Sequence, residues 1–81
     1  MHRKARVTVM LKKAVLDPQG QAVKDALQKL GFVGMHEVRV GKTIEITLDE
    51  KAQIQKSDLE QMANKLLANP VMEDFIVEIE Q

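Results

Sequence analysis

The clearest pattern in the chain is the alternation of apolar and polar residues over positions 38–48. Apolar residues stand at 38, 40, 44, 46 and 48, and polar residues at 39, 43, 45 and 47. A period of two is typical of a strand, or a pair of strands, with one buried face. The same alternation predicts a first strand at 4–12 and a last strand at 75–80.

Gly41 interrupts this alternating stretch, and two arrangements keep its apolar side chains on one face. A three-residue loop at 41–43 pairs position 40 with 44 and position 38 with 46. A single long strand bent at Gly41 has the same effect, because glycine accommodates a sharp bend. A two-residue loop is disfavoured because it would place Arg39 beside Ile44. The pattern does not separate a hairpin from one bent strand.

A first amphipathic helix is predicted with Asp17 as its N-cap and Pro18 as its first residue. The Asp17 carboxylate can accept from free amides of the first turn, where the missing N–H of Pro18 costs nothing. Five apolar residues share one helical face, and we expect them to be buried: Ala22, Val23, Ala26, Leu27 and Leu30. Gly20 is unusual inside a first turn, and either close backbone packing or the approach of a partner or ligand would explain it.

A second amphipathic helix is predicted to begin at Ser57. Ser57 caps the helix, and Glu60 three residues later reaches back, as in a capping box. The expected buried residues are Leu59, Met62, Ala63, Leu66 and Leu67. The helix is expected to stop at Asn69–Pro70, because proline disfavours helical geometry in the residue before it.

These elements predict a single α+β domain of residues 1–81 in the order strand, helix, strand, strand, helix, strand. Each strand and each helix has one apolar face, which favours an antiparallel sheet with both helices on one side, the ferredoxin-like plait. The first strand is then central, next to the last strand and the third. Its outward residues Lys4, Arg6 and Lys12 would lie between acidic neighbours and form favourable cross-strand pairs.

The composition excludes several classes of function. The 81 residues include no cysteine and two histidines, and their formal net charge is zero. A thiolate metal site and a cysteine nucleophile are therefore excluded, and no basic excess favours nucleic acid. No apolar run is long enough for a membrane span. We expect no catalytic residue, no metal ligand set, and neither a nucleic-acid nor a membrane partner.

A small-molecule-sensing regulatory domain of the ACT-like plait type is an alternative function. In such modules the ligand lies at a dimer interface, near a glycine-containing turn between a strand and a helix. The turn Leu16–Gly20 could serve in this way.

Four stretches of the sequence together resemble one family. They are residues 15–23 (VLDPQGQAV), 30–31 (LG), 38–42 (VRVGK) and 66–75 (LLANPVMEDF). Their order and spacing are similar to those of the PurS family, the small subunit of phosphoribosylformylglycinamidine (FGAM) synthase in purine biosynthesis. The resemblance covers nearly the whole chain, and the basic start at 1–4 and the loop at 50–56 depart from it.

The resemblance implies a non-catalytic subunit of a cytoplasmic, ATP-dependent glutamine amidotransferase. The complete enzyme converts formylglycinamide ribonucleotide, ATP and glutamine into the amidine FGAM. A homodimer, which could pair further into a tetramer, would join the large synthetase subunit to the glutaminase subunit and support ammonia transfer. No cofactor is expected in this chain; ATP and magnesium are expected in the large subunit.

The resemblance also identifies candidate interface residues, which are Gly20, Arg39, Gly41 and Lys42. Arg39 is suited to bidentate contact with a partner carboxylate. Gly41 permits a bend or a close approach, and Lys42 places a mobile charge beside it. Structural roles are expected instead for the caps and stops Asp17, Pro18, Ser57, Glu60, Asn69 and Pro70.

Overall fold

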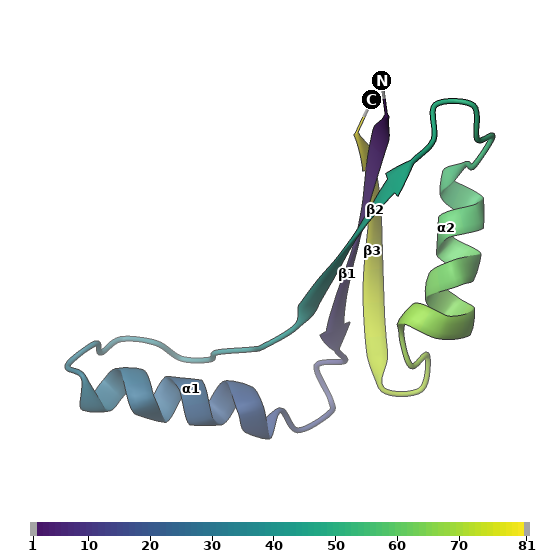
Figure 1. Ribbon diagram of the computed structural model, residues 1–81. Helices are drawn as coiled ribbons and strands as arrows, with labels where there is room; N and C mark the ends of the chain where they lie inside the picture. Colours follow the sequence, from purple (N-terminus) through teal and green to yellow (C-terminus); the bar gives the residue numbers. More distant parts are fainter. Residues whose placement is uncertain (1, 81) are drawn as a thin grey trace.

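The computed structural model describes residues 2–80, which form a three-stranded antiparallel sheet with two helices (Figure 1). Strand β1 (Arg3–Leu11) lies between β2 (Lys42–Leu48) and β3 (Glu73–Glu80) and is antiparallel to both. The α+β class and the central position of the first strand agree with the sequence prediction. No helix in residues 2–80 is long and apolar enough to cross a membrane.

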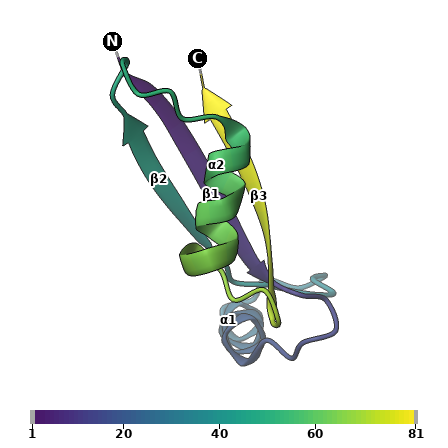
Figure 2. The same cartoon turned by 90° about the vertical axis from the view of Figure 1, so that its right-hand side faces the viewer.

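One face of the sheet is covered by α2 (Lys56–Met62) and by the π-helical segment η1 (Ala63–Leu67) that continues it (Figure 2). Alternate residues of the central strand point into this layer, and Ala5, Val7 and Val9 are fully or almost fully buried. From the helical side, Leu59 and Ala63 complete the core. The period-two pattern of the strands therefore has its expected cause, a buried face beneath a helix.

The opposite face of the sheet is polar and carries cross-strand ion pairs. Lys12 Nζ lies 2.8 Å from Asp74 Oδ1, and Lys4 Nζ lies 3.5 Å from Glu45 Oε1. Arg6 pairs with both Glu45 and Glu80, one on each neighbouring strand. The predicted basic strand between acidic strands is present, although such exposed pairs contribute only about 0–1 kcal/mol each.

Helix α1 (Pro18–Lys29) is not packed on the sheet, which differs from the predicted position. It lies beyond the end of the sheet, beside the segment that returns from its far end toward β2, and the molecule is elongated, 50 × 29 × 15 Å (Figure 1). Its apolar face is therefore open: Leu30 is 74% and Val23 38% exposed. The amphipathic pattern showed that one face is apolar but could not show which surface covers it. We call α1 together with residues 30–41 the arm.

Residues 38–41 lead into β2 without reversing direction, so the hairpin with a loop at 41–43 does not form. The chain is nearer to the second arrangement, a long extended segment, of which Lys42–Leu48 pairs with β1. Residues 38–41 belong to no ladder among the residues that the structure describes. The observed strand order is thus that of the plait without its fourth strand.

The second helix begins at Lys56, not at Ser57, so the predicted cap is wrong. The N-cap is Gln55, whose backbone N–H donates to Oδ2 of Asp58 at 2.9 Å. Asp58 thus takes the part predicted for Glu60, because the helix begins earlier and its third residue is Asp58. Lys56, expected in the preceding loop, is the first helical residue.

A π-turn ends the second helix and moves Leu66 out of the core. The backbone N–H of Ala68 donates to the carbonyl of Ala63, five residues earlier, at 2.8 Å. The extra residue in this turn shifts the register, so that Leu67 packs against the core and Leu66 is 83% exposed. The prediction that both leucines are buried is therefore wrong for Leu66.

The chain leaves this helix at the predicted place, through a turn built on Asn69. The side-chain Oδ1 of Asn69 accepts from the N–H of Val71 at 3.0 Å, and its carbonyl accepts from the N–H of Glu73 at 2.7 Å. Pro70 follows in the turn, and the preceding residues have left helical geometry by Ala68. This turn delivers the chain into β3.

Candidate functional site

The predicted site residues gather where the arm joins the sheet, apart from the caps of the second helix. Asp17 is the N-cap of α1, with Pro18 in the first turn. The N–H of Gly20 donates to Oδ1 of Asp17 at 2.9 Å. The second oxygen, Oδ2, accepts from the N–H of Val40 at 3.0 Å. One carboxylate therefore caps the helix and ties its start to the segment entering β2.

These two bonds hold the Asp17 carboxylate in its charged form. The N–H groups of Gly20 and Val40, in that order, are the main causes that lower the pKa of Asp17 below its ordinary value. The nearby positive charge of Arg39 lowers the pKa further, while burial opposes the shift. Asp17 is therefore a structural anion and not a proton-transfer group at neutral pH.

Gly20 is buried against the arm's own backbone. A Cβ at this position would overlap the carbonyl oxygen of Val38 and the carboxylate of Asp17. Of the two explanations that the sequence left open, the structure supports close backbone packing within the chain. The glycine allows the first turn of α1 and residues 38–40 to lie directly against each other.

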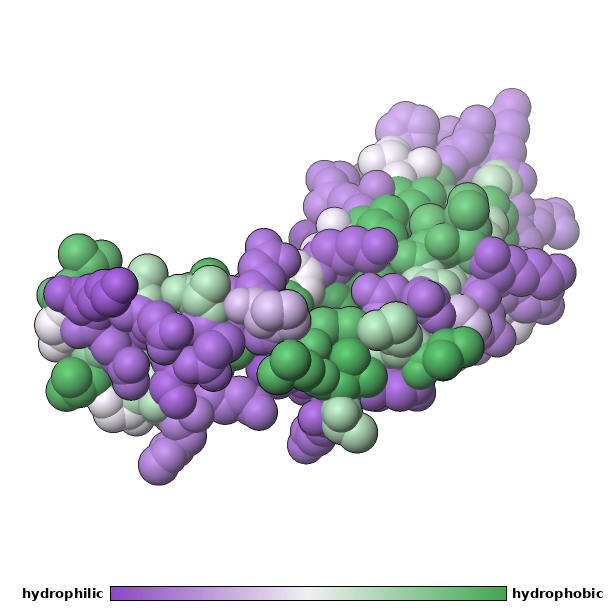
Figure 3. Space-filling view, turned by 90° about the horizontal axis from the view of Figure 1, so that it is seen from below, coloured by the Kyte–Doolittle hydropathy of each residue, from purple (hydrophilic) through white to green (hydrophobic). Residues whose placement is uncertain are grey.

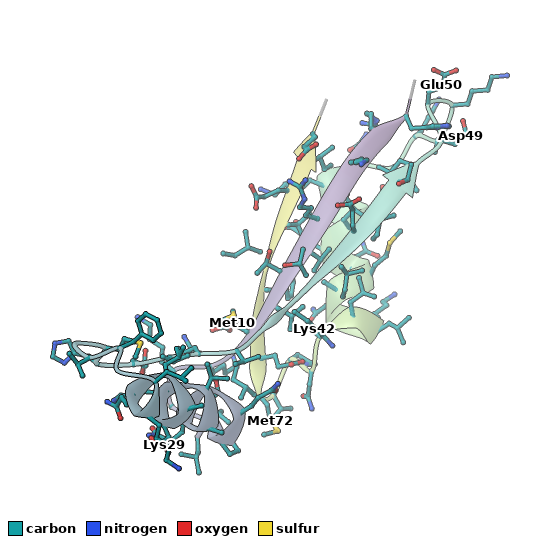
Figure 4. All side chains as sticks on the ribbon, turned by 60° about the vertical axis from the view of Figure 1, so that its left-hand side comes forward. Met10, Lys29, Lys42, Asp49, Glu50 and Met72 are labelled. Atoms are coloured by element: carbon teal, nitrogen blue, oxygen red, sulfur yellow. The ribbon has the colours of Figure 1, made fainter. Side chains whose placement is uncertain are left out.

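Gly41 also allows a close approach, here between the segment entering β2 and the end of β1. A Cβ at Gly41 would overlap the side chain of Met10 and approach the carbonyl oxygen of Val9. Lys42 follows as the first residue of β2, and its side chain is exposed. Met10 and Lys42 mark this crossing in Figure 4, at the end of the sheet nearest the arm.

Arg39 differs from the other candidate residues in having, within residues 2–80, a buried hydrogen-bond donor without an acceptor. Its Nη2 atom is buried and has no hydrogen-bond partner among the residues that the structure describes. The side chain borders two hollows. The first, the arm hollow, has about 390 Å³ and is lined by Lys13, Asp17, His36, Glu37 and Arg39, among others. The second, the sheet hollow, has about 360 Å³ and includes Lys13, Arg39, Phe75 and Ile76.

A third hollow, of about 350 Å³, lies between the start of α1 and the sheet. Its lining includes the apolar residues Val9, Leu11, Pro18 and Val40, together with Lys42. We call it the junction hollow. Residues 2–80 hold no cluster of three metal-ligating side chains.

The sequence predicts Asp17, Gly20, Arg39 and Gly41 as site or cap residues but does not reveal two features of the site. It assigns Asp17 only to helix capping, whereas the bond to Val40 joins residues 23 apart. It does not connect Lys13 with Arg39, which line the same hollows. Only the capping role has a local sequence signal; the other features depend on tertiary contacts.

The sequence matches one family model over residues 4–81, described as PurS: phosphoribosylformylglycinamidine (FGAM) synthase. The FGAM synthase subunit PurS of Methanocaldococcus jannaschii is 42% identical over 79 residues, which are 96% of this chain and 95% of the relative. The Bacillus subtilis PurS subunit is 41% identical over 78 residues, 96% of this chain and 93% of the relative.

Solved structures give the same result for the fold. The structure of Bacillus subtilis PurS matches with a TM-score of 0.85 and 40% identity, over 98% of this chain and 99% of that one. A chain in the structure of PurLQS from Thermotoga maritima matches with a TM-score of 0.81 over 99% of both chains. At 23% identity, this second likeness shows the fold alone.

Proposed function

The chain belongs to the PurS family of FGAM synthase in purine biosynthesis, and we propose that it bridges the two catalytic subunits of that enzyme. In this role it is a non-catalytic small subunit that joins a large synthetase subunit to a glutaminase subunit and supports ammonia transfer between them. The observation that carries the proposal is the match to curated PurS subunits over nearly the full length of both chains. The family match favours this role over the sensing-module alternative.

A further comparison supports a role in assembly. The solved structure of Methanocaldococcus jannaschii PurS, whose chain is 42% identical to this one, is described as one of the subunits of formylglycinamide ribonucleotide amidotransferase in the purine biosynthetic pathway. ATP and magnesium then act in the large subunit, and the complex works in the cytoplasm.

The working unit in this proposal is a homodimer, in which a second copy covers the arm. Exposed apolar residues gather at the outer end of the arm and below the sheet (Figure 3). At the arm's end, Leu30 is 74%, Phe32 61% and Val33 81% exposed. An uncovered apolar patch of this kind is typical of an interaction site, and closed two-fold dimers are the commonest oligomers.

The strand order supports one placement of the second copy in this proposal. Among the described residues β3 pairs with β1 on one side, and its other edge is open. Residues 38–41 are extended but unpaired, and the plait lacks one strand. In the proposed dimer the arm of one copy therefore completes the sheet and the helical layer of the other, which buries the apolar face of α1.

Gel filtration tests the bridging role directly. The large and glutaminase subunits from the same organism are mixed with and without this chain, and their elution is compared. We expect the large and glutaminase subunits to elute together only when the chain is present, and the chain to elute with them. Elution of the two catalytic subunits together in its absence, or exclusion of the chain from the complex, would contradict the proposal.

A further inference from the structure

The buried Nη2 of Arg39 indicates that a binding partner is missing from the single chain. Arg39 as a whole is partly buried, but its Nη2 donor is removed from water, and leaving a buried donor without an acceptor is costly. The guanidinium is close enough to Asp17 to lower the pKa of that carboxyl group. Yet no hydrogen bond or ion pair joins the two side chains.

The acidic side chains nearby do not neutralise Arg39. Both oxygens of Asp17 accept from backbone N–H groups, those of Gly20 and Val40. Asp74 in the sheet hollow is held by Lys12, with Nζ 2.8 Å from Oδ1. Glu37 lines the arm hollow but makes no ion pair with Arg39.

Lys13 is a second cation at the same place. It lines both the arm hollow and the sheet hollow, as Arg39 does, and makes no ion pair within residues 2–80. Two unpaired cations therefore border adjoining hollows of about 390 and 360 Å³. The sheet hollow adds an apolar wall from Leu11, Phe75 and Ile76.

We propose that Arg39 and Lys13 form a binding site for an oxyanion, a carboxylate or phosphate group that comes from outside the chain. Arg39 and Lys13 line both hollows, so an oxyanion seated there would lie between a guanidinium, whose planar fork suits bidentate contact, and the ammonium of Lys13. The oxyanion belongs either to a free small molecule or to an acidic side chain of another subunit. The second source rests on the proposed function, whereas the first does not.

Thermal unfolding of the isolated protein tests the free source. The melting temperature is measured in phosphate, and in acetate, against chloride at equal ionic strength. For an anion present at about ten times its dissociation constant we expect a rise of about 6–11 °C in the wild type. Arg39→Gln removes the unsatisfied donor, so it should unfold at or above the wild-type temperature in chloride but lose the rise. Lys29→Gln, a cation on α1 away from the hollows (Figure 4), should keep it.

Binding to the large and glutaminase subunits tests the second source. An acidic side chain from a partner predicts that Arg39→Gln weakens association about tenfold or more, whereas Lys29→Gln does not. Arg39→Lys, which keeps the charge but loses the fork, should lie between them. The site is supported if Arg39→Gln loses the anion-induced rise in melting temperature, or loses binding to the catalytic subunits, while Lys29→Gln keeps it. The site is wrong if Arg39→Gln and Lys29→Gln behave alike in both.

The two experiments also separate this inference from the proposed function. If wild-type protein does not bind the catalytic subunits, the bridging role fails, while an Arg39-dependent effect of phosphate or acetate would still establish the site. If wild-type protein binds and Arg39→Gln binds equally well without any anion effect, the site fails and the bridging role stands.

Discussion

Asp17 joins two segments that are far apart in the sequence. Its Oδ1 accepts from Gly20 in the first turn of α1, and its Oδ2 accepts from Val40 just before β2. Beside it, Gly20 lets the backbone of α1 touch Val38. The position of α1 relative to residues 38–40 therefore depends on a small group of residues at the start of the helix.

The lowered pKa of Asp17 predicts a dependence of stability on pH. A carboxyl group whose pKa is lower in the folded state stabilises that state fully above its unfolded-state pKa, about 4. The contribution is lost as the pH falls through the lower, folded-state pKa. Asp17→Asn should therefore unfold at a lower temperature than the wild type at pH 7, and the difference should shrink toward about pH 3.

The control for this experiment is Asp25→Asn, on the exposed side of the same helix, where the carboxylate accepts from the side chain of Gln21. The melting temperature of this variant should differ little from that of the wild type at either pH. If the melting temperature of Asp17→Asn lies below that of the wild type by the same amount at pH 7 and pH 3, the lowered pKa of Asp17 does not contribute to stability.

Gly20→Ala distinguishes intrinsic helix preference from packing. In an open helix alanine is more favourable than glycine by about 1 kcal/mol. At this position the added Cβ would overlap the Val38 carbonyl, and such overpacking costs about 1–3 kcal/mol. We expect the overlap to dominate, so that urea unfolding shows a less stable protein. Gln28→Ala, at an exposed position of α1, should have little effect; a stabilised Gly20→Ala would refute the close approach.

At the scale of the elements, local sequence signals predicted where each helix or strand lies better than they predicted which surface it packs against. The Asp17–Pro18 pair placed the start of α1, and period-two patterns placed β1 and β3, because both depend on neighbouring residues. The observed N-cap of α2, Gln55, lies two residues before the predicted cap Ser57, since Gln55 bonds to Asp58 although serine is the commoner type of cap. The apolar periodicity could not reveal the π-turn, because Leu66 and Leu67 are equally apolar.

The π-turn predicts opposite roles for two adjacent leucines. Leu67 packs against the core, whereas Leu66 is 83% exposed. We expect Leu67→Ala to lower the free energy of unfolding by about 2 kcal/mol, and Leu66→Ala by less than about 0.5 kcal/mol. Urea unfolding measures both. Equal losses would mean that the helix keeps a regular register and that both leucines are buried.

The apolar face of α1 makes a prediction about association. Leu30→Gln removes an exposed apolar side chain at the end of the helix and should not harm the fold of the single chain. If a second copy covers the arm, the dimer dissociation constant should rise about tenfold or more, which is what losing one buried leucine implies. Sedimentation over a range of concentrations measures this, with Lys29→Gln as the control. If Leu30→Gln dimerises with unchanged affinity, the arm is not part of the dimer interface.

At the scale of the whole molecule, the chain combines a covered sheet with an uncovered arm. The sequence predicted both helices on the sheet, because amphipathic patterns require a covering surface. The same patterns do not say whether that surface belongs to the same chain. The candidate site was predictable to a similar extent: Arg39 and the glycines were found, but the hollow that Arg39 shares with Lys13 arises only from the folded arrangement.

The proposed bridging role requires surfaces that other subunits can cover. The exposed apolar residues of the arm and the hollows beside Arg39 are two such surfaces. The central claim is that this chain couples the glutaminase to the synthetase.

Reconstituted activity tests that claim most directly. Formation of FGAM from formylglycinamide ribonucleotide and ATP is measured with the large and glutaminase subunits, with and without this chain. Glutamine and free ammonia are compared as nitrogen sources. The account predicts that glutamine-dependent formation requires the chain, whereas ammonia-dependent formation by the large subunit does not. Equal glutamine-dependent rates with and without the chain would contradict it.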